Sequence, residues 1–176
     1  GGTYAEALLG PIDTLDPLYA SSSAEIAASK LLFSSLYSYD QTGSLRGDLS
    51  EKLETNAAGT VYTVKLKEGV QWHDGALLTA KDVEFTINLI KNPETRSSLR
   101  VNWQDVKVKA VDDYTIQFEL PAVYASFPNA LTFAVLPQHL LKDVAPGAIR
   151  ENTFSQSPVG SGPFSFRLLQ SADEKK

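Results

Sequence analysis

The side chains that could perform acid–base, nucleophilic or metal chemistry are few in this sequence. It contains two histidines, His73 and His139, and no cysteine, so neither a thiol nucleophile nor a thiolate metal site can form. His73 is followed by Asp74 and Gly75, an order typical of a turn between a strand and a helix. Because a metal site needs three or four convergent ligands, we predict a structural turn at His73 and no metal centre.

Other residues that resemble catalytic groups also lack partners. Asp112 and Asp113 are adjacent, so at the tip of a hairpin their side chains diverge and stay hydrated instead of sharing a proton. The serines at residues 21–23 and 34–35 lie outside any Gly-x-Ser-x-Gly elbow. The Gly-Ser-Gly-Pro run at 160–163 lacks the Lys-Ser/Thr of a phosphate-binding loop, and its proline has no amide to offer a phosphate. The sequence therefore predicts no catalytic residue, no enzyme activity and no cofactor.

Two tryptophans and a tyrosine pair could instead stack on a sugar or an aromatic ligand. They are Trp72, Trp103, Tyr37 and Tyr39. Large aromatic side chains more often fill hydrophobic cores, so we predict that these residues fill cores or lie on the surface of an inserted domain.

Two helices have clear start signals. Residues 22–25 read Ser-Ser-Ala-Glu, the spacing of a capping box, and the apolar residues behind it predict a helix over about 23–36. Thr79 and Asp82 have the same spacing, and an apolar stripe then continues to Pro93, which ends the second helix.

The strand signals are alternating apolar and polar residues bounded by turns. We predict strands over residues 2–9, 61–67, 106–110 and 114–120, with Asp112 and Asp113 in the hairpin turn between the last two. The remaining expected elements are a brief strand near 133–136 between short helices, a loop over 144–157 and a strand beginning at Phe164. Residues 45–53 indicate a short irregular or helical stretch.

Composition and charge exclude several classes of protein. The 176 residues are 43% hydrophobic and carry a formal charge of -5, from 16 basic and 21 acidic residues. No run of basic residues marks a nucleic-acid-binding surface, so we expect no nucleic-acid partner. No apolar stretch approaches the ~20 residues that a membrane-spanning helix needs. Because the sequence opens with Gly1 and has no signal peptide, we expect any signal peptide to have been removed before this numbering begins.

One long ungapped segment and three short ones carry a family resemblance. Residues 62–85, reading Tyr-Thr-Val-Lys-Leu-Lys-Glu-Gly-Val-Gln-Trp-His-Asp-Gly and onward to Phe85, resemble the signature block of the family 5 solute-binding proteins of bacterial ABC importers. Residues 12–17, 111–116 and 158–164 fit the same family in the same order. The resemblance covers nearly the whole chain, but family members are much longer, so we expect this sequence to be the N-terminal part of such a protein.

The resemblance implies a fold and a domain division. The fold class is α/β, as a partial lobe of the class II periplasmic binding protein type with an inserted β-rich α+β domain. Residues 1–45 and 160–176 would belong to the first ligand-binding lobe, residues 46–159 would form the insert, and the second lobe would be absent. Residues 160–163 would then be the crossing point between insert and lobe.

The resemblance also implies a function, a site and partners. The function would be capture of oligopeptides or dipeptides for uptake, with a peptide ligand, an ABC permease and its ATPase as partners. The loop after the first strand, formed by Gly10, Pro11, Ile12, Asp13 and Thr14, would pair through its backbone with an extended peptide, although these residues also suit an ordinary turn. The charged groups that hold peptide termini would come mostly from the absent lobe.

Localisation and alternative functions follow from the same resemblance. We expect a monomer in the periplasm or on the outer face of the cytoplasmic membrane, held there only by a lipid anchor or by the permease. Other family members carry nickel chelates or oligosaccharides, which remain alternatives. A free-standing interaction or adhesion module with the same fold is a further alternative.

Overall fold

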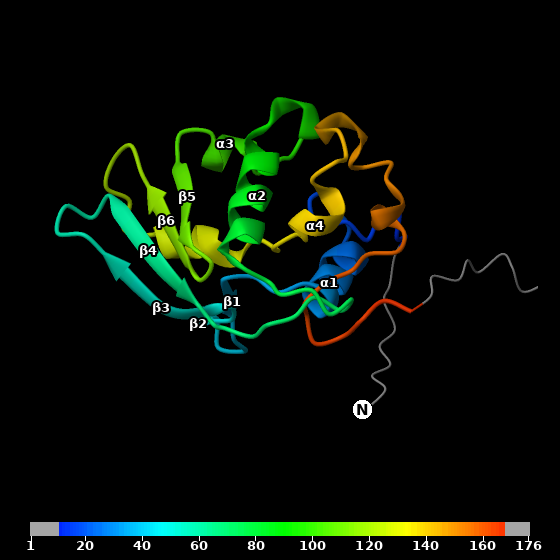
Figure 1. Ribbon diagram of the computed structural model, residues 1–176, viewed down its shortest axis with the longest axis horizontal. Coiled ribbons are helices and arrows are strands. Elements are labelled where there is room, and N and C mark those ends of the chain that lie inside the picture. The colour runs from blue at the N-terminus through cyan, green and yellow to red at the C-terminus, as the bar shows by residue number, and fades with distance from the viewer. Residues whose placement is uncertain (1–10, 168–176) are drawn as a thin grey trace, which may run out of the picture.

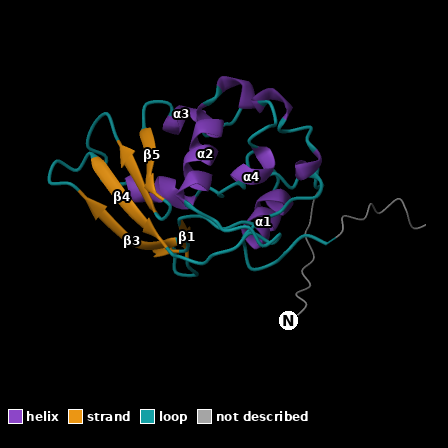
Figure 2. Cartoon of the chain, viewed as in Figure 1, coloured by secondary structure: helices purple, strands orange, loops and turns teal. Residues whose placement is uncertain are grey.

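The computed structural model describes residues 11–167 and places a four-stranded antiparallel sheet beside a group of helices (Figure 1). The sheet has the order β3-β4-β6-β5, and a separate two-stranded ribbon precedes it. Figure 2 shows the strands gathered at one end of the molecule and α1 and α4 at the other. The strands are β1 (Tyr37–Tyr39), β2 (Leu45–Gly47), β3 (Ser50–Thr55), β4 (Val61–Leu66), β5 (Lys107–Asp112) and β6 (Thr115–Glu119).

The central strands are those that the alternating pattern predicts. In β4, Tyr62, Val64 and Leu66 are buried, and the register pairs Tyr62 with Phe118 and Val64 with Ile116 of β6. Side chains that alternate in this way cover one face of a sheet, and here that face packs on the core. The strand predictions for 61–67, 106–110 and 114–120 are confirmed, whereas residues 2–9 lie outside the described range.

The prediction for residues 45–53 is wrong, because these residues form β2 and the start of β3. The side chains of β3 are mostly exposed and charged, as is common in an edge strand, so they carry no apolar alternation. The strand exists through its backbone pairing with β4, in which Leu53 lies opposite Val64 and Thr55 opposite Tyr62.

The two longer helices begin where their capping boxes predict. In α1 (Ser23–Leu32) and α2 (Ala80–Lys91) both hydrogen bonds of the capping box are present. Helix α1 ends at Leu32, four residues before the predicted end. The amides of Gly162 and Phe164 donate to the carbonyl oxygens of Leu32 and Leu31 at 2.9 and 3.0 Å, so a distant segment takes up the last carbonyls of the helix.

The remaining helices are short. Between α2 and β5 lie the 3-10 helix Pro93–Thr95 and α3 (Arg100–Trp103). After β6 follow α4 (Gln138–Leu141) and the 3-10 helices Phe127–Thr132, Pro146–Ala148 and Thr153–Ser155. The brief strand predicted near 133–136 is reduced to one bridge between Ser35 and Ala134. The predicted strand from Phe164 is not found in residues 164–167, since the Phe164 amide caps α1 instead.

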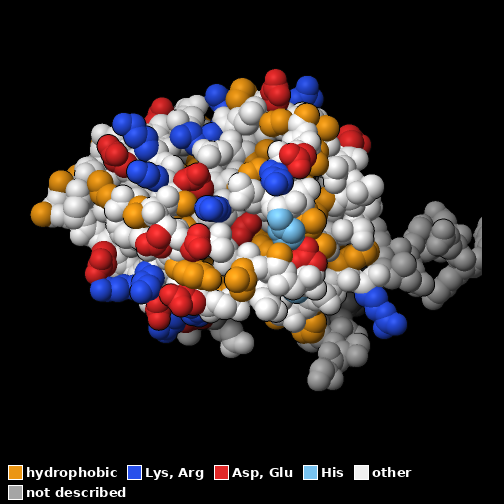
Figure 3. Space-filling view, in the orientation of Figure 1, with side chains coloured by type: hydrophobic (Ala, Val, Ile, Leu, Met, Phe, Trp, Pro, Cys, Tyr) orange, Lys and Arg blue, Asp and Glu red, His pale blue; other side chains and the backbone are white. Residues whose placement is uncertain are grey.

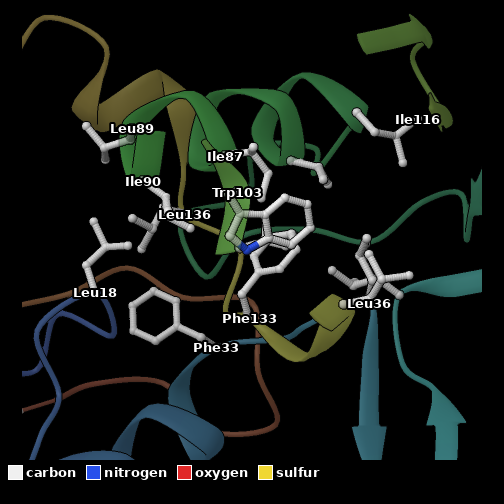
Figure 4. Close-up of a cluster of buried hydrophobic side chains, with 14 of the residues drawn as sticks. Leu18, Phe33, Leu36, Ile87, Leu89, Ile90, Trp103, Ile116, Phe133 and Leu136 are labelled. Carbon is white, nitrogen blue, oxygen red and sulfur yellow. The ribbon is translucent and has the colours of Figure 1, made fainter. Parts of the chain in front are cut away.

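The two tryptophans are in the core, as predicted. Trp72 and Trp103 are each 1% exposed, and Figure 4 shows Trp103 beside Phe133, below Ile87 of α2. The ring of Trp103 lies 5.4 Å from Phe133 and 5.7 Å from Phe118, within the usual range for aromatic pairs. Phe33 belongs to the same core cluster, so buried side chains from both sides of the predicted boundary at residue 45 pack together.

Within the described residues, no helix has both the length and the apolar character needed to cross a membrane.

Candidate ligand-facing loop

The loop at residues 11–14 directly precedes the turn that leads into α1. Pro11 and Asp13 are exposed, Ile12 is half-buried and packs against the core, and Thr14 is buried. Gly10, the first residue of the predicted site, lies outside the described range. Four of the five predicted residues are therefore placed, on one continuous segment that passes from the surface at Pro11 into the interior at Thr14.

The carboxylate of Glu25 holds this loop against the start of α1. Its Oε2 accepts hydrogen bonds from the amides of Asp13 and Thr14 at 2.9 and 3.0 Å. Its Oε1 accepts from the amides of Ser21 and Ser22, both at 3.1 Å. One buried carboxylate thus satisfies four backbone donors from two separate segments.

These hydrogen bonds keep Glu25 ionised. Burial raises the pKa of the Glu25 carboxyl, but the amide hydrogen bonds from Ser22, Ser21, Thr14 and Asp13 outweigh it and lower the pKa to about 2. Hydrogen bonds to the charged form of a carboxylate favour that form. The negative charge also lies in the first turn of α1, where the helix dipole stabilises an anion.

Other contacts fix the loop from a second side. The Pro11 carbonyl accepts from the Ser22 hydroxyl at 3.1 Å, and the Asp13 carbonyl accepts from Nε2 of Gln156 at 3.1 Å. The amide after the loop, that of Leu15, donates to the Ser155 carbonyl at 2.7 Å. The loop is therefore clamped between α1 and the 3-10 helix Thr153–Ser155.

Ile12 is the residue of the loop whose backbone remains unused. Among the described residues, neither its amide nor its carbonyl takes part in a hydrogen bond. A residue in an antiparallel bridge exchanges both of these groups with its partner. Within residues 11–14, the amides of Asp13 and Thr14 are already bound by Glu25. If a peptide pairs with the backbone of this loop, its partners would therefore be the amide and the carbonyl of Ile12.

Asp16 lies just beyond the loop in a contrasting environment. It is fully buried, its Oδ1 accepts from the Leu18 amide at 2.9 Å, and its Oδ2 has no hydrogen-bond partner. Burial raises the pKa of the Asp16 carboxyl to about 6, and the hydrogen bond from Leu18 opposes this only in part. A buried carboxyl without a second partner favours its neutral form.

The segment at residues 160–164 passes between the end of α1 and the turn at His73 (Figure 1). A Cβ atom on Gly160 would overlap the carbonyl oxygen of Leu32, and one on Gly162 would lie 2.6 Å from the carbonyl oxygen of Leu31. Ser34 donates through its hydroxyl to the Ser161 carbonyl at 3.1 Å. Glycines are required here because the two backbones are in direct contact.

The His73 turn is structural, as predicted. The amide of His73 donates to the Gly160 carbonyl at 2.9 Å, and its Nε2 lies 2.8 Å from the Gly162 carbonyl oxygen. The neighbouring Asp74 pairs with Nε2 of His139 at 2.6 Å. Both histidines therefore hold the turn in place, and among residues 11–167 no group of three or more His, Cys, Asp or Glu could hold a metal ion.

Comparison with known proteins shows which family this arrangement belongs to. Residues 44–173 match the family model described as "Bacterial extracellular solute-binding proteins, family 5 Middle". The match includes the whole four-stranded sheet, α2 and the glycine segment against α1. The chain belongs to this family.

Individual relatives cover almost all of this family 5 chain. The oligopeptide-binding protein AppA of Bacillus subtilis is 32% identical over 171 residues, which is 95% of this chain and 32% of AppA. The structure of AppA in complex with a nonapeptide has a TM-score of 0.86, with 30% identity over 94% of this chain and 34% of that one. NikZ of Campylobacter jejuni, in complex with Ni(L-His), has a TM-score of 0.81, with 34% identity over 92% of this chain and 32% of that one.

This family 5 chain spans about a third of the length of the relatives that it matches. The mixed helix and sheet fold predicted from the resemblance is confirmed by these structures. The family consists of extracellular solute-binding proteins, which are transport proteins, and this agrees with the predicted localisation at that coarse level.

The most important contact that the sequence did not predict is the one between Glu25 and the 11–14 loop. The capping-box spacing correctly places Glu25 beside Ser22, but nothing in the spacing indicates that its second oxygen binds the amides of Asp13 and Thr14. The burial of Asp16 was also missed, because an Asp-Pro pair after a loop usually marks an exposed turn.

Proposed function

We propose that the protein containing this chain is the substrate-binding component of an ABC importer and that it captures oligopeptides or dipeptides. The observation that carries the proposal is the likeness to AppA, which is named for oligopeptide binding, over 95% of this chain. The structure of AppA is described in complex with a nonapeptide. The proposal extends that ligand class to the present protein.

In this proposal the chain supplies one wall of the ligand cleft. Residues 1–45 and 160–176 belong to the first lobe, residues 46–159 form an insert, and the opposite lobe comes from the part of the relatives that this chain does not span. With one wall alone, we expect weak or no peptide binding. A peptide affinity tighter than micromolar for residues 1–176 by themselves would contradict this arrangement.

The 11–14 loop is the proposed contact with the peptide main chain. Its support is geometric, because the loop is held rigidly by Glu25 and Gln156 while the amide and carbonyl of Ile12 remain unused. Recognition through backbone groups does not depend on the side chains of the ligand. This mode of binding suits a receptor for peptides of varied sequence.

The proposed partners are the permease and ATPase subunits of the importer. Ligand binding would favour the closed arrangement of two lobes, and the permease would then distinguish the occupied receptor from the empty one. We place the protein in the periplasm or on the outer face of the cytoplasmic membrane, as a monomer, with or without a lipid anchor. We also propose that it is not an enzyme, so that peptides bound to it are released unchanged.

Native mass spectrometry tests the proposed ligand class. The protein at its natural length is purified without added ligand, and the masses of its bound adducts are measured. The proposal predicts a series of adducts that differ by amino-acid residue masses and that disappear on unfolding and refolding. A single adduct with the mass of a sugar or metal chelate, or no adduct combined with no binding of added peptides, would overturn it.

A nickel chelate is the second candidate ligand. It is favoured by the likeness to NikZ, whose structure is described in complex with Ni(L-His). The same measurement separates the two candidates, because a nickel chelate gives one adduct with the isotope pattern of nickel and is removed by a chelator.

A further inference from the structure

The two capping boxes of the chain share an unusual feature, which is that both carboxylates bind a distant segment. In an ordinary capping box the acidic side chain accepts only from the amide of the N-cap residue. In α2, Asp82 accepts from the amide of Thr79 at 2.9 Å and also from that of Gln138 at 2.9 Å. In α1, Glu25 accepts from its N-cap residue Ser22 and also from two consecutive amides of the 11–14 loop.

Two consecutive amides on one carboxylate oxygen restrict the path of the loop strongly. Both N–H groups, those of Asp13 and Thr14, must point to the same side of the chain toward Oε2 of Glu25. Thr14 is 5% exposed, so water cannot readily replace the carboxylate as its acceptor. Without Glu25 the loop would have to rearrange to satisfy these donors, because buried unpaired amides are rare in folded proteins.

We propose that Glu25 is a positioning residue for ligand binding. It fixes the 11–14 loop so that the backbone of Ile12 faces the ligand, and it does so without touching the ligand itself. This inference rests on the proposed function, in which the loop forms part of the cleft wall. Its physical basis is preorganisation, since a loop already held in its bound conformation loses less entropy when the ligand binds.

Glu25→Gln is the most informative variant, because it keeps the size and shape of the side chain. A glutamine amide offers one acceptor oxygen and one NH2 group, so one of the two pairs of backbone amides would face a donor instead of an acceptor. The matched control is Asp82→Asn, which damages the other capping box in the same way. Its partners, the amides of Thr79 and Gln138 and the ring nitrogen of Trp72, lie outside the 11–14 loop.

The experiment compares both variants with the unmodified protein at its natural length. Thermal unfolding of all three proteins is recorded first. Binding is then measured by calorimetry at a temperature at which all three are folded, with a defined mixture of peptides of two to nine residues as the probe. Amide hydrogen exchange at Asp13 and Thr14 is measured in the same samples. We expect both variants to unfold at lower temperature, but only Glu25→Gln to lose affinity, by about 10-fold or more, and to exchange faster at Asp13 and Thr14.

The outcomes separate this inference from the proposed function. If the unmodified protein binds no peptide, the proposed function is wrong and the inference is wrong with it. If the unmodified protein binds peptide and Glu25→Gln binds equally well, only the positioning role is wrong. An equal loss of affinity in Asp82→Asn would also overturn the inference, because the effect would then reflect lower stability alone.

Discussion

At the scale of single residues, the two carboxylates that flank the 11–14 loop have opposite protonation preferences. Glu25 has a pKa lowered to about 2, because its four amide hydrogen bonds outweigh the effect of burial. Asp16 has a pKa raised to about 6, because it is buried with only the Leu18 amide as a partner. Both side chains are shielded from solvent, but Glu25 accepts from four backbone amides and Asp16 from one.

The raised pKa of Asp16 predicts a pH-dependent stability. The unfolded chain ionises Asp16 near pH 4 and the folded protein near pH 6, so the contribution of Asp16 favours folding at low pH and is lost as pH rises through that window. Since each pKa unit corresponds to about 1.4 kcal/mol, Asp16→Asn should raise the free energy of unfolding at pH 7.5 by up to about 3 kcal/mol. At pH 4 the variant and the unmodified protein should be nearly equal. Urea unfolding at both pH values checks this, and a destabilised variant at pH 7.5 would contradict it.

The glycines of residues 160–164 give a second residue-scale prediction. Gly162→Ala would place a Cβ atom 2.6 Å from the carbonyl oxygen of Leu31, and such an overlap with backbone cannot be relieved by a rotamer change. We expect a loss of about 2–3 kcal/mol in the free energy of unfolding. Gly147→Ala is the control, because its Cβ would have no neighbour closer than 3.8 Å. Equal stabilities of the two variants in urea unfolding would contradict the close packing of this segment against α1.

The candidate site could be described from the sequence only in part. The choice of residues 11–14 rests on the family resemblance and stays a prediction, whereas the position of Glu25 follows from its spacing to Ser22. The hydrogen bonds that clamp the loop join residues as far apart as Asp13 and Gln156. Such contacts depend on tertiary packing, which local spacing does not encode.

At the scale of elements, a helix or strand was predicted correctly where its own residues carry a local sequence signal. The capping boxes of α1 and α2 and the apolar alternation of β4 and β6 are local signals, and these elements form where predicted. Edge strand β3 carries charged side chains and exists through pairing with β4. The strand predicted from Phe164 fails for a related reason, because the backbone of that segment caps α1.

The contact between α2 and the segment before α4 gives an element-scale prediction. The hydroxyl of Thr86 is fully buried, donates to the Asp82 carbonyl at 2.8 Å and accepts from the Leu136 amide at 2.9 Å. Thr86→Val keeps the shape but leaves that amide without an acceptor, so we expect a loss of about 1–3 kcal/mol in the free energy of unfolding. Thr86→Ser keeps the hydroxyl and should lose less. If the valine variant proves as stable as the serine variant, the hydroxyl bridge does not contribute.

At the scale of the whole molecule, the surface carries acidic and basic side chains that are mixed with one another. On the face shown in Figure 3, acidic and basic side chains alternate over the sheet and form no large patch of one sign. The formal charge of -5 reflects 21 acidic against 16 basic residues. This balance of charges depends on composition, so it can be read from the sequence without knowledge of the packing.

In the proposed function, a peptide ligand pairs with the clamped 11–14 loop through the backbone of Ile12. This pairing can be measured by residue-resolved amide hydrogen exchange in the protein at its natural length, with and without a saturating peptide mixture. We predict that the Ile12 amide exchanges rapidly without ligand and slows when peptide binds, whereas the amides of Asp13 and Thr14 exchange slowly in both states. Unchanged exchange at Ile12 in a sample that calorimetry shows to be saturated with peptide would contradict this pairing.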